Sequence, residues 1–161
     1  MSERIKRNSA PTNNSVELVT MVPAHVEELM AYERDMFGTE AWTRGSYLTE
    51  LADTRGRCYL AALDEGALVG WAGVLVVAET AEILTVGVVP AARGRGIARM
   101  LVGSLRDEAR RRGAREAFLE VRVDNAAARQ LYASEGYAEI GTRPGYYDAG
   151  RVDAVVMHRE L

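Results

Sequence analysis

The chain has 161 residues, of which 48% are hydrophobic and 27% charged, a balance typical of one soluble globular domain with a full core. Its formal net charge of −3 argues against a broad nucleic-acid-binding surface. It contains no apolar stretch near the roughly 20 residues that a membrane span needs. We therefore expect no direct contact with nucleic acid or a membrane. Because no signal-peptide pattern opens the sequence, we also expect a cytoplasmic protein.

Residues 1–15 are polar and aperiodic, which predicts a disordered tail before a single domain over residues 16–161. Cys58 is the only cysteine, so no intramolecular disulfide can form, and its apolar neighbours predict a buried thiol. His25 and His158 have no partners at ligand spacing, so we expect no metal site.

Hydrophobic spacing predicts elements in the order β-α-α-β-β-β-α-β-α-β-β. These elements are expected at Val16–Val22, Pro23–Phe37, Thr43–Leu51, Arg57–Leu63, Ala67–Ala78, Ala81–Val89, Gly96–Arg112, Ala117–Val123, Asn125–Glu135, Tyr137–Thr142 and Val152–Arg159. The strand–helix–strand unit over residues 81–123 implies a local parallel pair inside a mostly antiparallel sheet, which is a mixed α/β (α+β) class. The segment Arg143–Arg151 is expected to be a loop joining the last two strands.

The most informative segment reads Arg93-Gly94-Arg95-Gly96-Ile97-Ala98, between a predicted strand and an amphipathic helix. Two glycines allow a ligand to approach the backbone closely. The first N–H groups of the helix lack intrahelical partners and lie at the positive end of its dipole. Such a turn suits a diphosphate, although an ordinary glycine-containing cap would have the same sequence.

Further candidate residues lie before and after this turn. Alternation places Glu120 opposite the apolar face of its strand, where it is either a solvent-facing carboxylate or a general base. Asn125 is expected to cap the next helix. Tyr132 on that helix is either a core aromatic or a proton donor. Gly87 either makes room for a neighbouring element or exposes a backbone N–H to an oxyanion.

Together these motifs resemble the GCN5-related N-acetyltransferase (GNAT) superfamily, and within it the RimI type that acetylates an N-terminal alanine of a small-subunit ribosomal protein. The matching residues are Val88-Val89-Pro90, Arg93-x-x-Gly96-x-Ala98, Leu119-Glu120-Val121-Arg122, Asn125 and Leu131-Tyr132-x-x-x-Gly136-Tyr137. The resemblance implies a central, mostly antiparallel seven-stranded sheet with the fourth and fifth strands parallel, flanked by about four helices.

The resemblance also implies roles for individual residues. Glu120 matches the general base and Tyr132 the general acid. Acetyl-CoA is the implied co-substrate, with no metal, and its expected contacts are Val86, Gly87, Val88, Arg93, Gly94, Arg95, Gly96, Ile97, Ala98, Arg99 and Asn125. Tyr146, Tyr147 and Trp42 are expected near the substrate. The expected partner is a protein or peptide N-terminus, bound by a monomer or weak dimer.

Other functions are compatible with the same motifs. One is a GNAT enzyme for a small-molecule amine or a lysine side chain, since the fold and the coenzyme motif serve all of these acceptors. The segment Met36–Trp42 differs in length from the usual entry of the family, which leaves the acceptor open. Another is a non-catalytic module that senses acetyl-CoA. The presence of both Glu120 and Tyr132 favours an enzyme, because a sensor needs neither.

Overall fold

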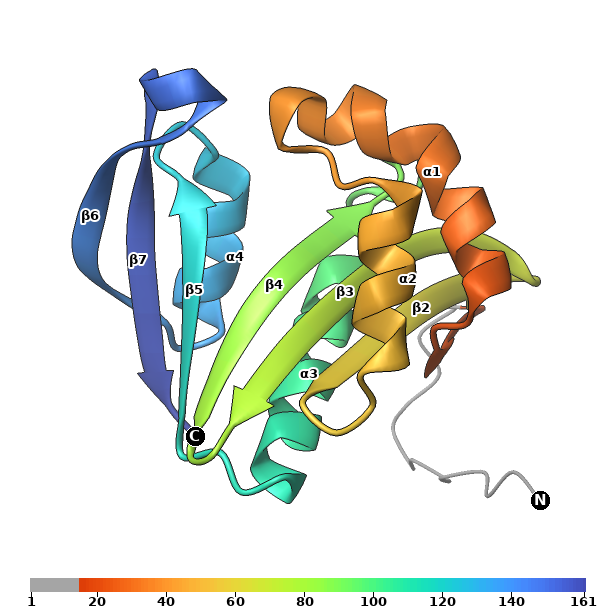
Figure 1. The fold of residues 1–161 in the computed structure, drawn as a ribbon, viewed down its shortest axis with the longest axis horizontal. Coiled ribbons are helices and arrows are strands. Elements are labelled where there is room, and N and C mark those ends of the chain that lie inside the picture. The colour runs from red at the N-terminus through yellow and green to blue at the C-terminus, as the bar shows by residue number, and fades with distance from the viewer. Residues whose placement is uncertain (1–14) are drawn as a thin grey trace.

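The computed structural model describes residues 15–161, which form one seven-stranded sheet with helices on its faces (Figure 1). The strands are β1 (Val16–Thr20), β2 (Arg57–Asp64), β3 (Ala67–Val77), β4 (Thr80–Val88), β5 (Glu116–Arg122), β6 (Ala138–Tyr147) and β7 (Val152–Glu160). The helices are α1 (Pro23–Phe37), α2 (Arg44–Ala52), α3 (Ile97–Arg111) and α4 (Ala126–Ser134), with short 3-10 turns η1 (Gly38–Glu40), η2 (Pro90–Ala92) and η3 (Asp148–Gly150).

The sheet has the order β1-β2-β3-β4-β5-β7-β6, and every neighbouring pair is antiparallel except β4 with β5. That parallel pairing covers only Thr80–Glu82 against Glu116–Phe118. Beyond it the two strands diverge, as Figure 1 shows. The predicted mixed sheet with one parallel pair is therefore confirmed. The divergence also leaves the backbone groups of β4 that face β5 without a strand partner.

Helix α3 covers one face of the central strands. Its apolar stripe is buried at Ile97, Leu101, Val102, Leu105 and Ala109. This stripe packs α3 against β2, β3 and β4, while α1 and α2 contact β3 and β2 from the opposite face (Figure 1). β3 is therefore covered on both faces, which is why it contains the longest run of buried residues in the sheet.

Local capping interactions mark the start of α2 and the end of α3 near the positions that the sequence predicts. The hydroxyl of Thr43 accepts the backbone N–H of Ser46 at 3.0 Å and so caps α2. Gly113 follows α3 with a φ of 93°, and its N–H donates to the carbonyl of Arg110 at 3.0 Å. These positions are satisfied locally, which is why sequence reasoning finds them.

The final hairpin differs from the expectation. The loop predicted at Arg143–Arg151 is wrong, because β6 continues through a bulge to Tyr147 and only η3 separates it from β7. Pro144 reads as a strand breaker, but β6 is an edge strand, where a missing N–H is tolerated. The first strand ends at Thr20, not Val22, and Val123 lies beyond β5 with 41% of its surface exposed.

The tail predicted at residues 1–15 falls outside the described residues except for Ser15, whose hydroxyl hydrogen bonds Asp64. Cys58 is half-buried and packs against the core rather than inside it. Among the described residues, no helix combines the length and the apolar character needed to cross a membrane.

Candidate active site

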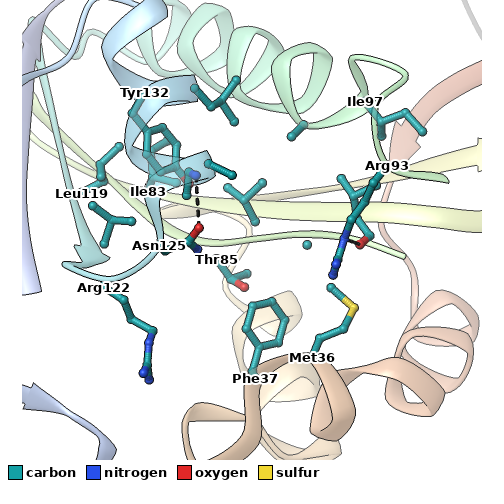
Figure 2. Close-up of a pocket in the computed structure, with 18 of the residues that line it drawn as sticks. Met36, Phe37, Ile83, Thr85, Arg93, Ile97, Leu119, Arg122, Asn125 and Tyr132 are labelled. Atoms are coloured by element: carbon teal, nitrogen blue, oxygen red, sulfur yellow. Dashed lines mark hydrogen bonds between the residues drawn. The ribbon is translucent and has the colours of Figure 1, made fainter. Parts of the chain in front are cut away.

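A cleft of about 810 Å³ opens where β4 and β5 separate. One wall comes from Ile83–Val88 of β4 and another from Leu119–Arg122 of β5. The start of α3, one side of α4 and the end of α1 complete it. In Figure 2, Arg93 and Ile97 lie on one side, Leu119, Arg122 and Asn125 on the other, and Met36 and Phe37 approach from α1. Sequence segments far apart therefore meet in one cavity.

The glycine turn lines the end of the cleft next to α3. Gly94 and Gly96 have φ values of 79° and 77°, in the left-handed region that favours glycine. A Cβ added to either residue would meet no atom within 4 Å, so the turn borders open space. Gly96 is the N-cap of α3, and the helix's first backbone bond runs from the N–H of Met100 to its carbonyl. The N–H groups of Ile97, Ala98 and Arg99 are therefore available to a ligand.

Gly87 on β4 has a clear packing role. A Cβ there would come within 2.7 Å of the Trp71 ring, so only glycine lets this ring pack beneath the strand. Val86, Gly87 and Val88 also line the cleft on the unpaired edge of β4. The Nε of Arg93 donates to the carbonyl of Val88 at 3.3 Å, which joins the glycine turn to the end of the strand.

Glu120 lines the other wall of the cleft, and its carboxylate is paired with a residue of the C-terminal hairpin formed by β6 and β7. The Nε of Arg143 lies 3.0 Å from its Oε1, and 15% of the Glu120 side chain is exposed. A hydrogen bond to Glu120 raises the pKa of Tyr146 above its ordinary value. Glu120 is thus a part-buried carboxylate with partners, rather than the solvent-facing strand residue of the simpler interpretation.

Tyr132 faces both the cleft and the core. Its residue surface is 8% exposed, and its ring packs edge-to-face on Tyr137 with centroids 5.9 Å apart. Burial raises the pKa of Tyr132, so its hydroxyl stays protonated at neutral pH. Tyr132 therefore packs in the core and also lines the cleft, so the two alternatives that the sequence offered do not exclude each other.

Asn125 caps α4, as predicted. Its Oδ1 accepts the N–H of Ala128 at 3.1 Å, the bond drawn in Figure 2. This engages the side-chain oxygen in the fold and leaves the amide N–H groups as its remaining donors.

Of the three residues expected near the substrate, two line the cleft and one does not. Trp42 and Tyr147 line the cleft, and burial raises the pKa of Tyr147 to about 12. Tyr146 does not line it and is 50% exposed, although its ring packs on Tyr147 with centroids 4.9 Å apart.

The two arginines expected near the coenzyme are both held in ion pairs. Arg95 does not line the cleft and pairs with Asp64 at 2.8 Å. Arg99 lines it while pairing with Glu135 at 2.6 Å.

Two cleft carboxylates escaped the sequence analysis. Both line the cleft; Glu33 is only 1% exposed, and Glu40 accepts the N–H of Asp148 at 2.5 Å. Glu33 had a signal, because it stands four residues after Leu29 and four before Phe37 and so falls on the apolar stripe of α1. No sequence pattern pointed to Glu40, because its partners Asp148 and Arg122 are distant in the sequence and come close only in the fold.

Comparison with known proteins places the chain in a family and a fold that have been described before. The family model described as the acetyltransferase (GNAT) family matches residues 24–137. The N-alpha-acetyltransferase RimI of Mycobacterium tuberculosis is 36% identical over 150 residues, covering 90% of this chain and 92% of that protein. An uncharacterised protein of Mycobacterium leprae is 39% identical over 153 residues, which are 92% of this chain but only 42% of that protein.

A similar solved structure is the ribosomal-protein-S18-alanine N-acetyltransferase of Escherichia coli. It has a TM-score of 0.80 and 26% sequence identity, with 91% of this chain and 94% of that chain covered. The predicted fold class and the family resemblance are both confirmed by these matches.

Proposed function

The chain belongs to the acetyltransferase (GNAT) family, and on that basis we propose that it transfers the acetyl group of acetyl-CoA to the N-terminal amine of a protein that begins with alanine. One observation carries the proposal. A single cleft contains a glycine turn suited to a diphosphate and a carboxylate and a phenol suited to proton transfer. The names of the relatives in Mycobacterium tuberculosis and Escherichia coli support the choice of acceptor.

The residues present fit the coenzyme. The open space beside Gly94 and Gly96 and the free N–H groups at the start of α3 would hold its diphosphate. The unpaired edge of β4 at Val86–Val88 would hydrogen bond its extended arm, and the amide of Asn125 would lie near the reactive end. When bound, acetyl-CoA supplies the acetyl group as an activated thioester.

The chain's own residues supply the proton transfers. An α-amine has an ordinary pKa near 8 and is mostly protonated at pH 7. Glu120 would accept its proton, directly or through water, after the amine displaces Arg143. Tyr132, which keeps its proton at neutral pH, would supply the one that the departing thiolate takes up. Holding both reactants in one cleft supplies much of the remaining acceleration.

An acceptor screen tests the proposal. Peptides that differ only in the first residue, including one copied from the N-terminus of ribosomal protein S18, are incubated with acetyl-CoA beside free polyamines and lysine-containing peptides with blocked N-termini. Mass spectrometry locates the acetyl group. We expect acetylation of the α-amine of alanine peptides. Preferred transfer to lysine side chains or polyamines would contradict the acceptor class, and no transfer to any amine would contradict the enzyme.

A further inference from the structure

Glu33 is the only charged residue of the described range that is buried, with 1% of its surface exposed, yet it lines the cleft. A carboxylate taken out of water is costly unless other groups satisfy it. Burial raises the pKa of Glu33, and hydrogen bonds from Trp42 and Tyr47 oppose this rise. The proposed proton transfers use Glu120 and Tyr132, so they do not account for this second carboxylate.

The two oxygens of Glu33 hold two different segments. Oε1 accepts the backbone N–H of Trp42 at 3.1 Å, and Oε2 accepts the hydroxyl of Tyr47 at 2.9 Å. The hydroxyl oxygen of Tyr47 in turn accepts the indole N–H of Trp71 at 3.1 Å. One side chain of α1 thus ties the segment before α2, α2 itself and β3 together.

The segment held through Trp42 borders the end of the cleft that contains Glu120. Trp42 follows η1, and Glu40 of that turn lies 3.5 Å from Arg122 on β5, two residues after Glu120. The Trp42 ring also lines the cleft and packs on Tyr47 with centroids 5.1 Å apart. The glycine turn lies at the start of α3, on another element. The hydrogen bond to Trp42 therefore fixes a wall next to the candidate base.

We infer that Glu33 is a positioning residue, which holds Trp42 in place and thereby shapes the acceptor end of the cleft without shaping the coenzyme end. The inference rests on the proposed function, because it assigns the end containing Glu120 to the acceptor amine. Glu33 acts here through the reach of its side chain and not through its charge. Its carboxylate reaches the Trp42 N–H and the Tyr47 hydroxyl at the same time, which requires a side chain of glutamate length.

Two substitutions separate reach from charge. Glu33→Gln keeps the length, and its amide can present oxygen to the Trp42 N–H and NH₂ to the Tyr47 oxygen, whose hydroxyl hydrogen then turns to its other side-chain partner, Thr85. Glu33→Asp keeps the charge but is shorter by one carbon–carbon bond, about 1.5 Å. Both changes are milder than truncation to alanine, which would leave two donors unsatisfied and risk the fold.

Steady-state kinetics with an alanine-initiated peptide, together with the Kd for acetyl-CoA, measure the effect. We expect Glu33→Asp to raise the peptide KM about tenfold, equivalent to roughly one lost hydrogen bond, and to leave the Kd for acetyl-CoA within about twofold of wild type. Glu33→Gln should keep both values near wild type. A normal aspartate variant would overturn the inference, as would a glutamine variant in which the peptide KM rises as much as in the aspartate variant.

Hydrogen exchange at the Trp42 amide supplies a readout that does not need the reaction. We expect its protection to fall in Glu33→Asp and to persist in Glu33→Gln, and unchanged protection in Glu33→Asp would overturn the inference. Wild-type protein that acetylates no peptide would contradict the proposed function instead, while the exchange measurement would still decide whether Glu33 holds Trp42.

Glu50 provides the matched control. It is a part-buried carboxylate on α2 that accepts a tyrosine hydroxyl, that of Tyr59, at 2.7 Å, but it does not line the cleft. Glu50→Asp should lower the melting temperature without changing the peptide KM. An equal rise of the peptide KM in both aspartate variants would reduce Glu33 to a general stabilising residue and overturn its positioning role.

Discussion

The carboxylate of Glu120 on β5 is paired with the guanidinium of Arg143 on β6 at 3.0 Å. The proposed acceptor also brings a cation, its protonated α-amine, to this carboxylate. Arg143 therefore occupies the carboxylate that the proposed acceptor would need. The Arg143 side chain is 58% exposed although that of Glu120 is only 15% exposed, and an ion pair open to water on one side contributes about 1 kcal/mol. The pair is weak enough to be exchanged.

Replacing Arg143 tests this competition. We expect Arg143→Gln to lower the KM for an alanine-initiated peptide by up to about fivefold, the factor that corresponds to 1 kcal/mol. The change should be largest at low ionic strength, because salt screens the exposed pair. Arg143→Lys, which keeps the cation, is the control. An unchanged KM at low salt would show that the amine does not compete with Arg143.

The proposed role of Glu120 as proton acceptor is tested by replacing Glu120 itself. Glu120→Gln keeps the shape but cannot accept a proton, so we expect kcat to fall roughly a hundred- to ten-thousandfold. The Kd for acetyl-CoA should stay near wild type. The defect should shrink between pH 7 and pH 9, because a growing share of the amine is already free. Wild-type kcat at pH 7 would leave Glu120 as a structural partner of Arg143.

Tyr132→Phe separates catalysis from packing. The edge-to-face contact with Tyr137 needs only the ring, so the folded state should survive. We expect kcat to fall on the order of tenfold to a hundredfold, since a thiolate is already a tolerable leaving group. Melting curves recorded beside the kinetics check the fold. Full activity in a stable Tyr132→Phe protein would point to water as the proton donor.

The glycine turn has a matched pair of substitutions. Gly96 and Gly113 both have positive φ, and both face open space, but they lie at opposite ends of α3. Gly96→Glu should weaken acetyl-CoA binding by more than about tenfold, because a carboxylate would meet the diphosphate and block charge-assisted hydrogen bonds. Gly113→Glu should lower stability similarly and leave the Kd unchanged. Calorimetric titration decides, and equal Kd values would remove the turn from the coenzyme site.

Stability at alkaline pH follows from the buried phenols. Burial is the main cause that raises the pKa values of Tyr47, Tyr59 and Tyr132. The stability that their neutral forms contribute is complete below the unfolded-state pKa of about 10 and is lost as pH rises through the higher folded-state values. The melting temperature should fall above about pH 10, and less steeply in Tyr132→Phe. Parallel curves for both proteins would contradict this assignment.

The sequence predicted the elements well where their signals are local. The stripe of α3, the caps at Thr43 and Asn125 and the turn at Gly96 depend on residues a few positions apart, so spacing reveals them. The predicted loop at Arg143–Arg151 failed for the opposite reason. Pro144 disfavours a strand in general, and only the place of β6 at the sheet edge makes it acceptable.

The candidate site divides in the same way. Residue types and motif spacing offered the glycine turn, Glu120 and Tyr132 as candidates, and the resemblance to the acetyltransferase (GNAT) family supplied the roles of base and acid, because a motif is read from the sequence without the fold. Only the tertiary structure decided that Glu120 faces Arg143, that Gly87 makes room for Trp71, and that Glu33 holds Trp42. The partners in the first two contacts come from different strands, brought together by sheet pairing and burial. The third joins α1 to a backbone amide beyond η1, so no local pattern of side chains encodes it.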